Sequence, residues 1–416
     1  MCIYVIVLDE TTQRAQPQSV VFGGYTKKAS YGFEILLKEK TFEQILVLSI
    51  NRKDLTHVKH VREFLKTITD DEEVKKQIEE YWIFTLEVQC KDPNCCTVRL
   101  LSKFIKYFEK HEPAKQLIVD FTTSTNIFTK FCVALALEIL RHLYGIDYRL
   151  YDFDRRSHSL ILREFDTKVV SFTKDPLESS IKILELVLRC SETAPSDRHS
   201  ITLLMGKLER IRESLGELAF DVALSELESL NSLVSLTSRR VEDPNVVEIV
   251  QHLPITQYLP KGNEIEKLRK FVRFLKESNR LDLALRYLLI KIVVILFSYC
   301  CYFGKLSRDL CRIDTISKIL DDPSITEVLR IFDNELISSA IHLMKLFSKF
   351  HIARPYCKSL CFDDLSNIGK VVCEGFIPGE EVSKILDGLL LQLETLPYYE
   401  TCEKLQAVLD RLYKSR

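Results

Sequence analysis

Glycine is scarce in this sequence, with 12 in 416 residues, and the glycine-rich phosphate-binding motifs are missing with it. There is no G-x-G-x-x-G and no Walker A loop, and the pair Gly23-Gly24 stands alone between polar residues. A dinucleotide site or a P-loop site of the usual kind is therefore not expected. The G-x-S-x-G elbow and the H-E-x-x-H motif are also missing, so nothing in the sequence indicates a routine hydrolase or metalloprotease.

An excess of charge of one sign is missing too. The chain has 58 Lys and Arg against 59 Asp and Glu, a formal net charge of -1. This balance excludes a strongly basic nucleic-acid coat and an acidic tail, but not a local basic groove. One stretch of basic residues could form such a groove for RNA: Lys267, Arg269, Lys270, Arg273, Lys276 and Arg280. The default interpretation of this stretch is a solvated helix face.

No apolar run is long enough for a membrane span of roughly 20 residues. The most apolar stretch, Ile292 to Phe303, follows Arg286 and Lys291 and indicates a buried core helix or dimer helix. The first residues have no basic region and no cleavage site, so Ile3 to Leu8 is interpreted as a strand. We expect a cytoplasmic protein without a membrane partner.

Cysteine is frequent, but the paired C-x-x-C spacing of structural zinc sites is absent. The 13 cysteines are an odd number and cannot all pair within the chain. We expect buried or disulfide-bonded cysteines rather than zinc ligands, and no metal or cofactor. The tightest groupings are Cys90 with Cys95 and Cys96, and His351 with Cys357, Cys361 and Cys373.

Strand-like apolar runs alternate with amphipathic stretches over the first part of the chain. The predicted strands are Ile3 to Leu8, Ile45 to Ile50, Tyr81 to Val88, Gln116 to Phe121, Tyr148 to Phe153 and Ser159 to Phe165. The predicted helices are Tyr31 to Lys40, Leu55 to Ile68, Val98 to Lys110, and Ile127 to Leu143 with Gly145 as its C-terminal cap. The alternation predicts a mostly parallel, doubly wound sheet over residues 1–172, which binds ligands at the carboxyl ends of its strands.

The rest of the chain is predicted to be helical. Residues 173–200 are interpreted as a helix followed by a polar linker, Ser191 to Ser200, and residues 201–416 as a helical domain. The fold class is thus α/β plus all-α. One apolar seam at coiled-coil spacing suits either a bundle core or a dimer contact: Leu208, Ile211, Leu215, Leu218 and Val222.

Two polar loops follow predicted strands and are the candidate ligand-binding residues. The first opens the helix that begins at Ile127 and contains Asp120, Thr122, Thr123, Ser124, Thr125 and Asn126. Hydroxyls at a helix N-terminus can bind phosphate without glycine, although Ser124 or Thr125 could simply cap the helix. The second loop, with Asp9, Thr11 and Thr12, is acidic and suits ribose or base groups. Arg155 and Arg156 could supply positive charge.

The sheet domain, the loop from Asp120 to Asn126 and the helical second half together resemble the CRISPR-associated Rossmann-fold (CARF) proteins of type III systems. The similar family is the one named for an Asp-x-Thr-His-Gly motif, of which Asp120 and Thr122 match, while Thr123 and Ser124 replace His and Gly. The resemblance implies a homodimer that binds a cyclic oligoadenylate between two sensor domains. It also implies a helical nuclease domain of the HEPN type.

HEPN ribonuclease sites carry Arg and His in an R-x(4-6)-H pattern, in which His shuttles a proton and Arg holds the phosphate. Only His252, His342 and His351 lie in the helical half, and none has Arg five to seven residues before it. The segment most similar to the motif has Ser366 at the Arg position, Asn367 as in the family, and Cys373 near the His position. These are degenerate catalytic positions.

Three functions therefore compete. The first is a cyclic-oligoadenylate sensor of type III CRISPR defence whose HEPN-like half has lost the usual ribonuclease site. The second is an active enzyme, either a ribonuclease with an atypical site or a ring nuclease that cleaves the cyclic oligoadenylate. The third, a transcription regulator, is disfavoured because no compact helix-turn-helix is recognisable.

Overall fold

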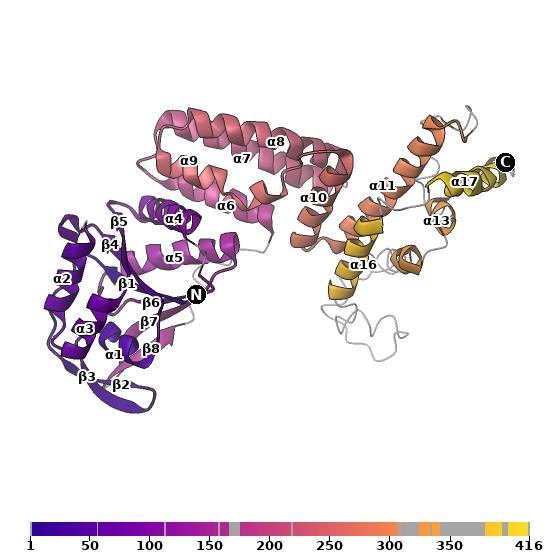
Figure 1. Cartoon of the computed structure of the whole chain (residues 1–416). Coiled ribbons are helices and arrows are strands. Elements are labelled where there is room, and N and C mark those ends of the chain that lie inside the picture. Colours follow the sequence, from indigo (N-terminus) through magenta and orange to yellow (C-terminus); the bar gives the residue numbers. More distant parts are fainter. Residues whose placement is uncertain are drawn as a thin grey trace. The chain divides into compact units, whose positions relative to one another are not determined.

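The chain divides into two compact units, Met1–Gln257 and Tyr258–Arg416 (Figure 1). The computed structural model describes residues 2–55, 57–111, 114–156, 159–165, 175–217, 219–306, 311, 324–332, 335–341, 379–392 and 398–414. The first unit contains one mixed sheet with helices, as the α/β expectation required, and the described part of the second unit is helical. The boundary expected at residues 173–200 falls inside the first unit.

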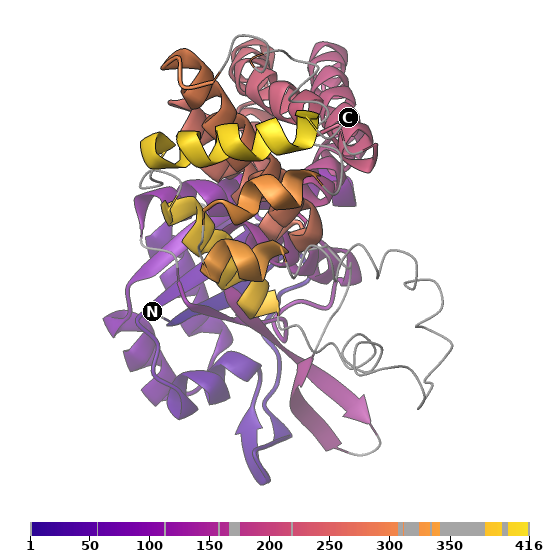
Figure 2. The same cartoon turned by 90° about the vertical axis from the view of Figure 1, so that its right-hand side faces the viewer.

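The sheet of the first unit has eight strands in the order β3-β2-β8-β7-β6-β1-β4-β5. β1 lies at the centre, parallel to β4 on one side and β6 on the other. The antiparallel pair β7 and β8 is drawn in magenta in Figure 2. The bounds are β1 (Cys2–Leu8), β2 (Gln18–Phe22), β3 (Tyr25–Ala29), β4 (Gln44–Ile50), β5 (Ile83–Val88), β6 (Gln116–Asp120), β7 (Asp147–Arg156) and β8 (Ser159–Phe165).

The parallel strands wind outward from the centre in both directions. After β1 the chain forms the β2–β3 hairpin at the edge beside β8, and it then returns to β4 and β5 on one side of β1. It next crosses back to β6 and β7 on the other side of β1. The strand order therefore reverses between β1 and β6. In open parallel sheets this switch point is where ligands bind, outside the carboxyl ends of the strands.

Helices cover both faces of this sheet, as Figure 1 shows. One face carries α1 (Gly32–Glu39), α2 (Val58–Ile68) and α3 (Glu72–Glu80), and the other carries α4 (Pro93–Lys110) and α5 (Ile127–Tyr144). Alternate residues of β1 face opposite layers, so Tyr4, Ile6 and Leu8 join the core under α1–α3 while Ile3 and Val5 face away from it. This double burial explains the unbroken apolar runs of β1 and β4.

The expected strands and helices of the first 165 residues are all present, with end shifts of a few residues. The sequence interpretation missed α3 and the hairpin of β2 and β3. Gly23 and Gly24 form the turn of this hairpin at φ of 58° and 85°, which suits the two-residue turns with positive φ that join antiparallel strands. The glycine pair therefore has a structural role that was not recognised.

Four helices follow the sheet within the first unit: α6 (Pro176–Arg189), α7 (Pro195–Gly216), α8 (Phe220–Arg240) and α9 (Pro244–Gln251). The expected linker is wrong from Pro195 onward, because this proline opens α7, where its missing N–H costs nothing. α7 and α8 lie side by side, and α6 and α9 pack on α4.

The expected apolar seam does not continue from α7 into α8. Leu208, Ile211 and Leu215 are buried on α7, which agrees with a bundle core, whereas Val222 on α8 is 51% exposed. Leu218 lies outside the described residues. The chain leaves the helix between Gly216, where α7 ends, and Phe220, where α8 begins. This break separates residues that the heptad spacing had placed on one helix face.

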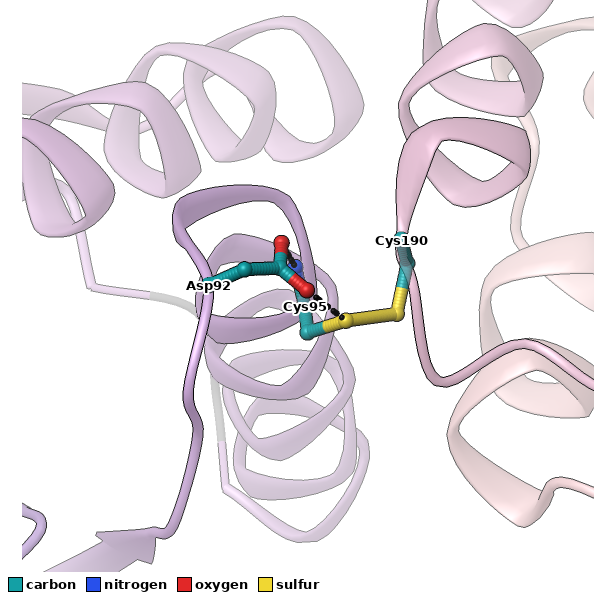
Figure 3. Close-up of side chains that lie close together, drawn as sticks. All are labelled: Asp92, Cys95 and Cys190. Carbon is teal, nitrogen blue, oxygen red and sulfur yellow. Dashed lines mark hydrogen bonds between the residues drawn. A yellow bond between two sulfur atoms is a disulfide. The ribbon is translucent and has the colours of Figure 1, made fainter.

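Two disulfides surround the start of α4. Cys90 pairs with Cys96, and Cys95 pairs with Cys190, the residue that follows α6 (Figure 3). Asp92 caps α4 by accepting the backbone N–H of Cys95 at 3.0 Å, and it also accepts a hydrogen bond from Ser191. The sheet and the helices that follow it are thus covalently joined within the first unit.

The second unit is built around α11 (Leu281–Tyr302). The other described helices contact it directly or pack beside it, and Cys300 on α11 is bonded to Cys402 on α17. By length and composition α11 is the one described helix that could cross a membrane, but 56% of its most apolar window is buried inside the protein. The other bounds are α10 (Glu264–Glu277), α13 (Ser324–Arg330), α16 (Gly379–Gln392) and α17 (Tyr398–Lys414).

The expected HEPN-like positions Ser366, Asn367 and Cys373 lie outside the described residues, as do His342 and His351. The basic stretch starts on α10, where Lys276 binds Asp387 of α16 at 2.9 Å. Three of its other cations also have interaction partners: Lys267, Arg269 and Lys270.

Candidate functional site

The two polar loops expected to bind a ligand lie side by side at the switch point. Asp9 to Thr12 follows β1, and Phe121 to Asn126 follows β6 and leads into α5. Because β1 and β6 are paired, with Ile6 beside Asp120, their carboxyl ends bring the loops together. All nine predicted residues therefore lie at one edge of the sheet.

Asp9 links the two loops through its carboxylate. Its Oδ1 accepts the backbone N–H of Thr11 at 2.9 Å and the Thr11 hydroxyl at 2.6 Å. Its Oδ2 accepts the Ser124 hydroxyl from the other loop. The Thr11 hydroxyl in turn accepts the backbone N–H of Thr125 at 3.1 Å. This hydrogen bond and the one from Ser124 therefore join the loop after β1 to the loop after β6. Asp9 is 1% exposed and Ser124 is 1% exposed, which makes this link internal.

Asp120 organises the base of the second loop. Its carboxylate accepts the Tyr4 hydroxyl and the backbone N–H of Thr122, each at 2.8 Å. Complete burial raises the pKa of Asp120 to about 6, although hydrogen bonds from Thr122 and Tyr4 favour the carboxylate. Burial, and then the negative charge of Asp120, raise the pKa of Tyr4 well above its ordinary value. A carboxyl that can hold a proton near pH 6 thus lies directly under the loop.

Gly32 at the start of α1 is a site residue that the sequence interpretation missed. Its backbone N–H donates to the Thr122 hydroxyl at 2.7 Å, so the loop caps α1 in place of the helix's own Tyr31. A Cβ at this position would lie 2.9 Å from Thr122 Cγ2 and 3.1 Å from Asp120 Oδ1. Glycine is therefore needed for the close approach of helix and loop. In the sequence, Gly32 is recognisable only as a glycine at the start of an apolar helix.

Thr12 and Arg52 stabilise the first loop through hydrogen bonds to its backbone. The Thr12 hydroxyl accepts the backbone N–H of Asp9 at 3.0 Å, and the Arg52 guanidinium donates to the Thr12 carbonyl at 3.0 Å. Arg52 lies over the Phe64 ring at 4.3 Å from its centre and forms an ion pair with Asp54. Arg52 thus positions the backbone of the first loop. No sequence pattern had marked it as a site residue.

Asn126 caps α5, rather than Ser124 or Thr125. The Asn126 Oδ1 accepts the backbone N–H of Phe128 at 2.9 Å. Ser124 supports this cap by accepting the backbone N–H of Asn126 at 3.2 Å. Thr123 donates its hydroxyl to the Val7 carbonyl of β1. The loop is therefore a rigid structure in which most of the hydroxyl groups have protein partners.

The nine predicted residues separate into a buried framework and an accessible rim. Six are buried: Asp9, Thr12, Asp120, Thr122, Thr123 and Ser124. Thr125 is exposed, and Thr11 and Asn126 are half-buried. Beside them, Ile127 is 82% exposed and Phe131, one helical turn further, is 43% exposed. The rim thus combines two hydroxyls, an amide, a helix N-terminus and two apolar side chains.

The electrostatics of the edge are mixed. Asp9 and the exposed Glu10 are acidic, whereas the first turn of α5 carries the positive end of a helix dipole. Lys130 is held by Asp152. Arg155 and Arg156 end β7, but their side chains lie outside what the structure describes.

Two groups of possible metal ligands occur among the described residues, and neither is at the switch point. Asp92, Cys95 and Cys190 form one, in which both sulfurs belong to the disulfide of Figure 3. The other joins α4 to the end of α9, where His252 Nε2 lies 3.1 Å from Glu109 Oε1 beside Glu248. Burial, and then the charge of Glu109, raise the pKa of Glu248. The expectation of no metal stays a prediction.

No protein-family model matches this chain, and no curated protein is significantly similar to it in sequence.

Proposed function

We propose that the first unit is a nucleotide sensor that binds a cyclic oligoadenylate at the edge formed by the Asp9 and Thr125 loops. The observation that carries this proposal is the position of these two loops on either side of the switch point between β1 and β6. Nucleotide sites of doubly wound sheets lie at this position. The oligoadenylate class, and a role in type III CRISPR defence, follow from the resemblance to CARF proteins.

The rim suits the parts of such a ligand. A phosphate would lie at the start of α5, where the Thr125 hydroxyl and the helix dipole favour an anion. Adenine rings would pack on Ile127 and Phe131, which are exposed beside Thr125. The acidic first loop would face ribose hydroxyls through the exposed Glu10, because its carboxylate accepts hydrogen bonds and repels phosphate.

We propose further that two copies bind one ring between them, because one rim contacts only one side of a large ligand. The helical part of the chain would then act by dimerising, or by binding RNA or another molecule, rather than by cleaving RNA with the usual HEPN pair. Arg and His are missing at the required spacing throughout the helical half.

The test is to incubate the purified full chain separately with cyclic oligoadenylates and with labelled RNA. A sensor binds the ring and leaves both substrates intact. Opening of the ring, or cleavage of RNA upon ring binding, would identify an enzyme instead. Thr125→Val should weaken ring binding about ten-fold, as expected for the loss of a hydrogen bond to a charged group. The control is Thr202→Val, which removes an exposed hydroxyl on α7.

A further inference from the structure

A cavity of about 610 Å³ lies at the opposite edge of the sheet from the switch point. Its floor is made by the amino ends of the central strands, with Cys2 of β1, Gln116 of β6 and Arg149 of β7, and its wall by the end of α1. The seven residues of β1 separate the two edges by roughly 20 Å at the usual rise per residue. We call this cavity the α1 pocket. Its volume is in the range of sites for small molecules.

Three of the four charged residues that line the α1 pocket are cations: Lys38, Lys40 and Arg149, against the single acid Glu39. Lys38 is bound to Asp71 and Glu73, and Glu39 is bound to Lys27, so both are engaged by side chains of opposite charge. Arg149 forms an ion pair with the half-exposed Glu164, whereas the hydrogen bond of Lys40 is to the neutral Tyr151 hydroxyl.

Lys40 and Arg149 are positioned to act together. The Lys40 ammonium donates to the Tyr151 hydroxyl at 2.8 Å, and this contact leaves it further N–H donors. The Arg149 guanidinium is 47% exposed and reaches Glu164 at 3.5 Å, the outer limit of a hydrogen bond. Tyr151 also donates to Glu164, at 3.1 Å, so one network orients both cations.

The other lining groups suit an organic molecule rather than a bare ion. Leu37 and Ile118 are apolar, and the buried Phe42 ring is stacked on Tyr4 with 4.7 Å between the ring centres. Gln77 also lines the pocket, and its side-chain oxygen is buried without a hydrogen-bond partner among the described residues. A buried amide oxygen of this kind is costly unless a ligand or water supplies a donor.

We propose that the α1 pocket binds a small organic anion, whose carboxylate or phosphate group is held by Lys40 and Arg149. The amide of Gln77 would accept a hydrogen bond from a hydroxyl or amino group of the same molecule. Lysine and arginine together supply the charge, and the planar donors of arginine match both oxyanions. This site is separate from the switch-point edge and does not depend on the function proposed for it.

The first test is calorimetric titration of the full chain with AMP, citrate and, as the neutral probe, adenosine. We expect AMP or citrate to bind and adenosine to bind at least ten-fold more weakly. Binding of AMP alone would identify a phosphate ligand, and binding of citrate alone a carboxylate ligand. No binding of either anion, or equal binding of AMP and adenosine without citrate binding, would overturn the proposal.

Variants assign the binding to the pocket. Lys40→Gln and Arg149→Gln should each weaken anion binding about ten-fold, while Lys28→Gln, an exposed lysine on β3, should not. Thr125→Val at the switch point should also leave it unchanged. Anion binding that survives both pocket variants, or that is lost in Thr125→Val, would contradict the site assignment.

The free thiol of Cys2 provides an independent readout, because it lines the pocket and is half-buried. Alkylation of Cys2 by a maleimide, followed by mass spectrometry of its peptide, should slow several-fold when the bound anion is present. The protection should disappear in Arg149→Gln and persist in Lys28→Gln. Unchanged Cys2 alkylation at saturating anion would place the ligand elsewhere and overturn the proposal.

Discussion

Asp120 lies at the centre of the predicted site but is fully buried, so its ionisation affects folding as well as any ligand. Its ordinary pKa is 3.8, and burial raises it to about 6 in the folded protein. Between these values the folded state holds a proton that the unfolded state has lost. The folded state is therefore stabilised as the pH falls from about 6 to about 4. Above pH 6 the charged carboxylate costs on the order of 3 kcal/mol.

This argument predicts a specific difference between the wild type and Asp120→Asn. The asparagine side chain does not titrate, so the variant should lack this part of the pH dependence. The difference in unfolding free energy, wild type minus variant, should rise by about 2 to 3 kcal/mol from pH 7 to pH 4. Urea denaturation across this range measures it. Parallel stability curves for the two proteins would contradict the proposed pKa.

Gly32 is predicted to be intolerant of a side chain. In Gly32→Ala the new Cβ would lie 2.9 Å from Thr122 Cγ2 and 3.0 Å from Leu162 Cδ1, so the loop or the helix has to move. We expect a loss of about 1 to 3 kcal/mol in unfolding free energy. Gly206→Ala on α7 is the matched control, because nothing lies within 4 Å of its Cβ and alanine favours a helix by roughly 0.5 to 1 kcal/mol. Equal effects of the two variants would refute the close-approach argument.

The residue types of the site were predictable, but their individual roles were not. Loops after β1 and β6 were recognised from hydroxyl and acidic residues at strand ends. That Ser124 binds Asp9, and that Thr123 binds the Val7 carbonyl, depends on which strands are neighbours. Contacts between residues more than a hundred positions apart leave no local pattern. The sequence therefore indicated nine ligand-binding candidates where the structure leaves three accessible.

At the scale of elements, burial decided what could be predicted. β1 and β4 are buried on both faces, which produces apolar runs that a sequence shows clearly. β3 lies at the edge of the sheet and contains Lys27 and Lys28, so it lacks such a run and was missed. The end of α7 at Gly216 was missed because the apolar spacing continues across it.

The Cys95–Cys190 disulfide is predicted to stabilise the junction between α4 and α6. It closes a loop of 95 residues, and a bridge of this kind contributes about 2 to 4 kcal/mol by restricting the unfolded chain. In urea denaturation under oxidising conditions, the double variant Cys95→Ser, Cys190→Ser should lose that amount of unfolding free energy. Cys2→Ser, which removes a free thiol, should change stability by less than about 0.5 kcal/mol. A double variant as stable as the oxidised wild type would show that the bridge does not stabilise the fold.

For the whole molecule, the division into two units limits what each part can explain. The switch-point edge and the α1 pocket both belong to the first unit, which contains the complete sheet and α1 to α9. The helical character of the described residues in the second half was predicted from their apolar periodicity, whereas the boundary between the units was not. α6 to α9 have helical sequences like those of the second unit. Only the packing of α6 and α9 on α4, and of α7 and α8 on these two helices, shows where they belong.

Calorimetric titration of the full chain with a cyclic oligoadenylate, beside the linear oligoadenylate of the same length, tests the central claim most directly. We predict saturable binding of the cyclic ligand with one ring for every two chains, and clearly weaker binding of the linear ligand. Thr125→Val should weaken the cyclic ligand's binding about ten-fold. Absence of binding, or binding of equal strength by the cyclic and linear ligands that Thr125→Val leaves unchanged, would contradict the account.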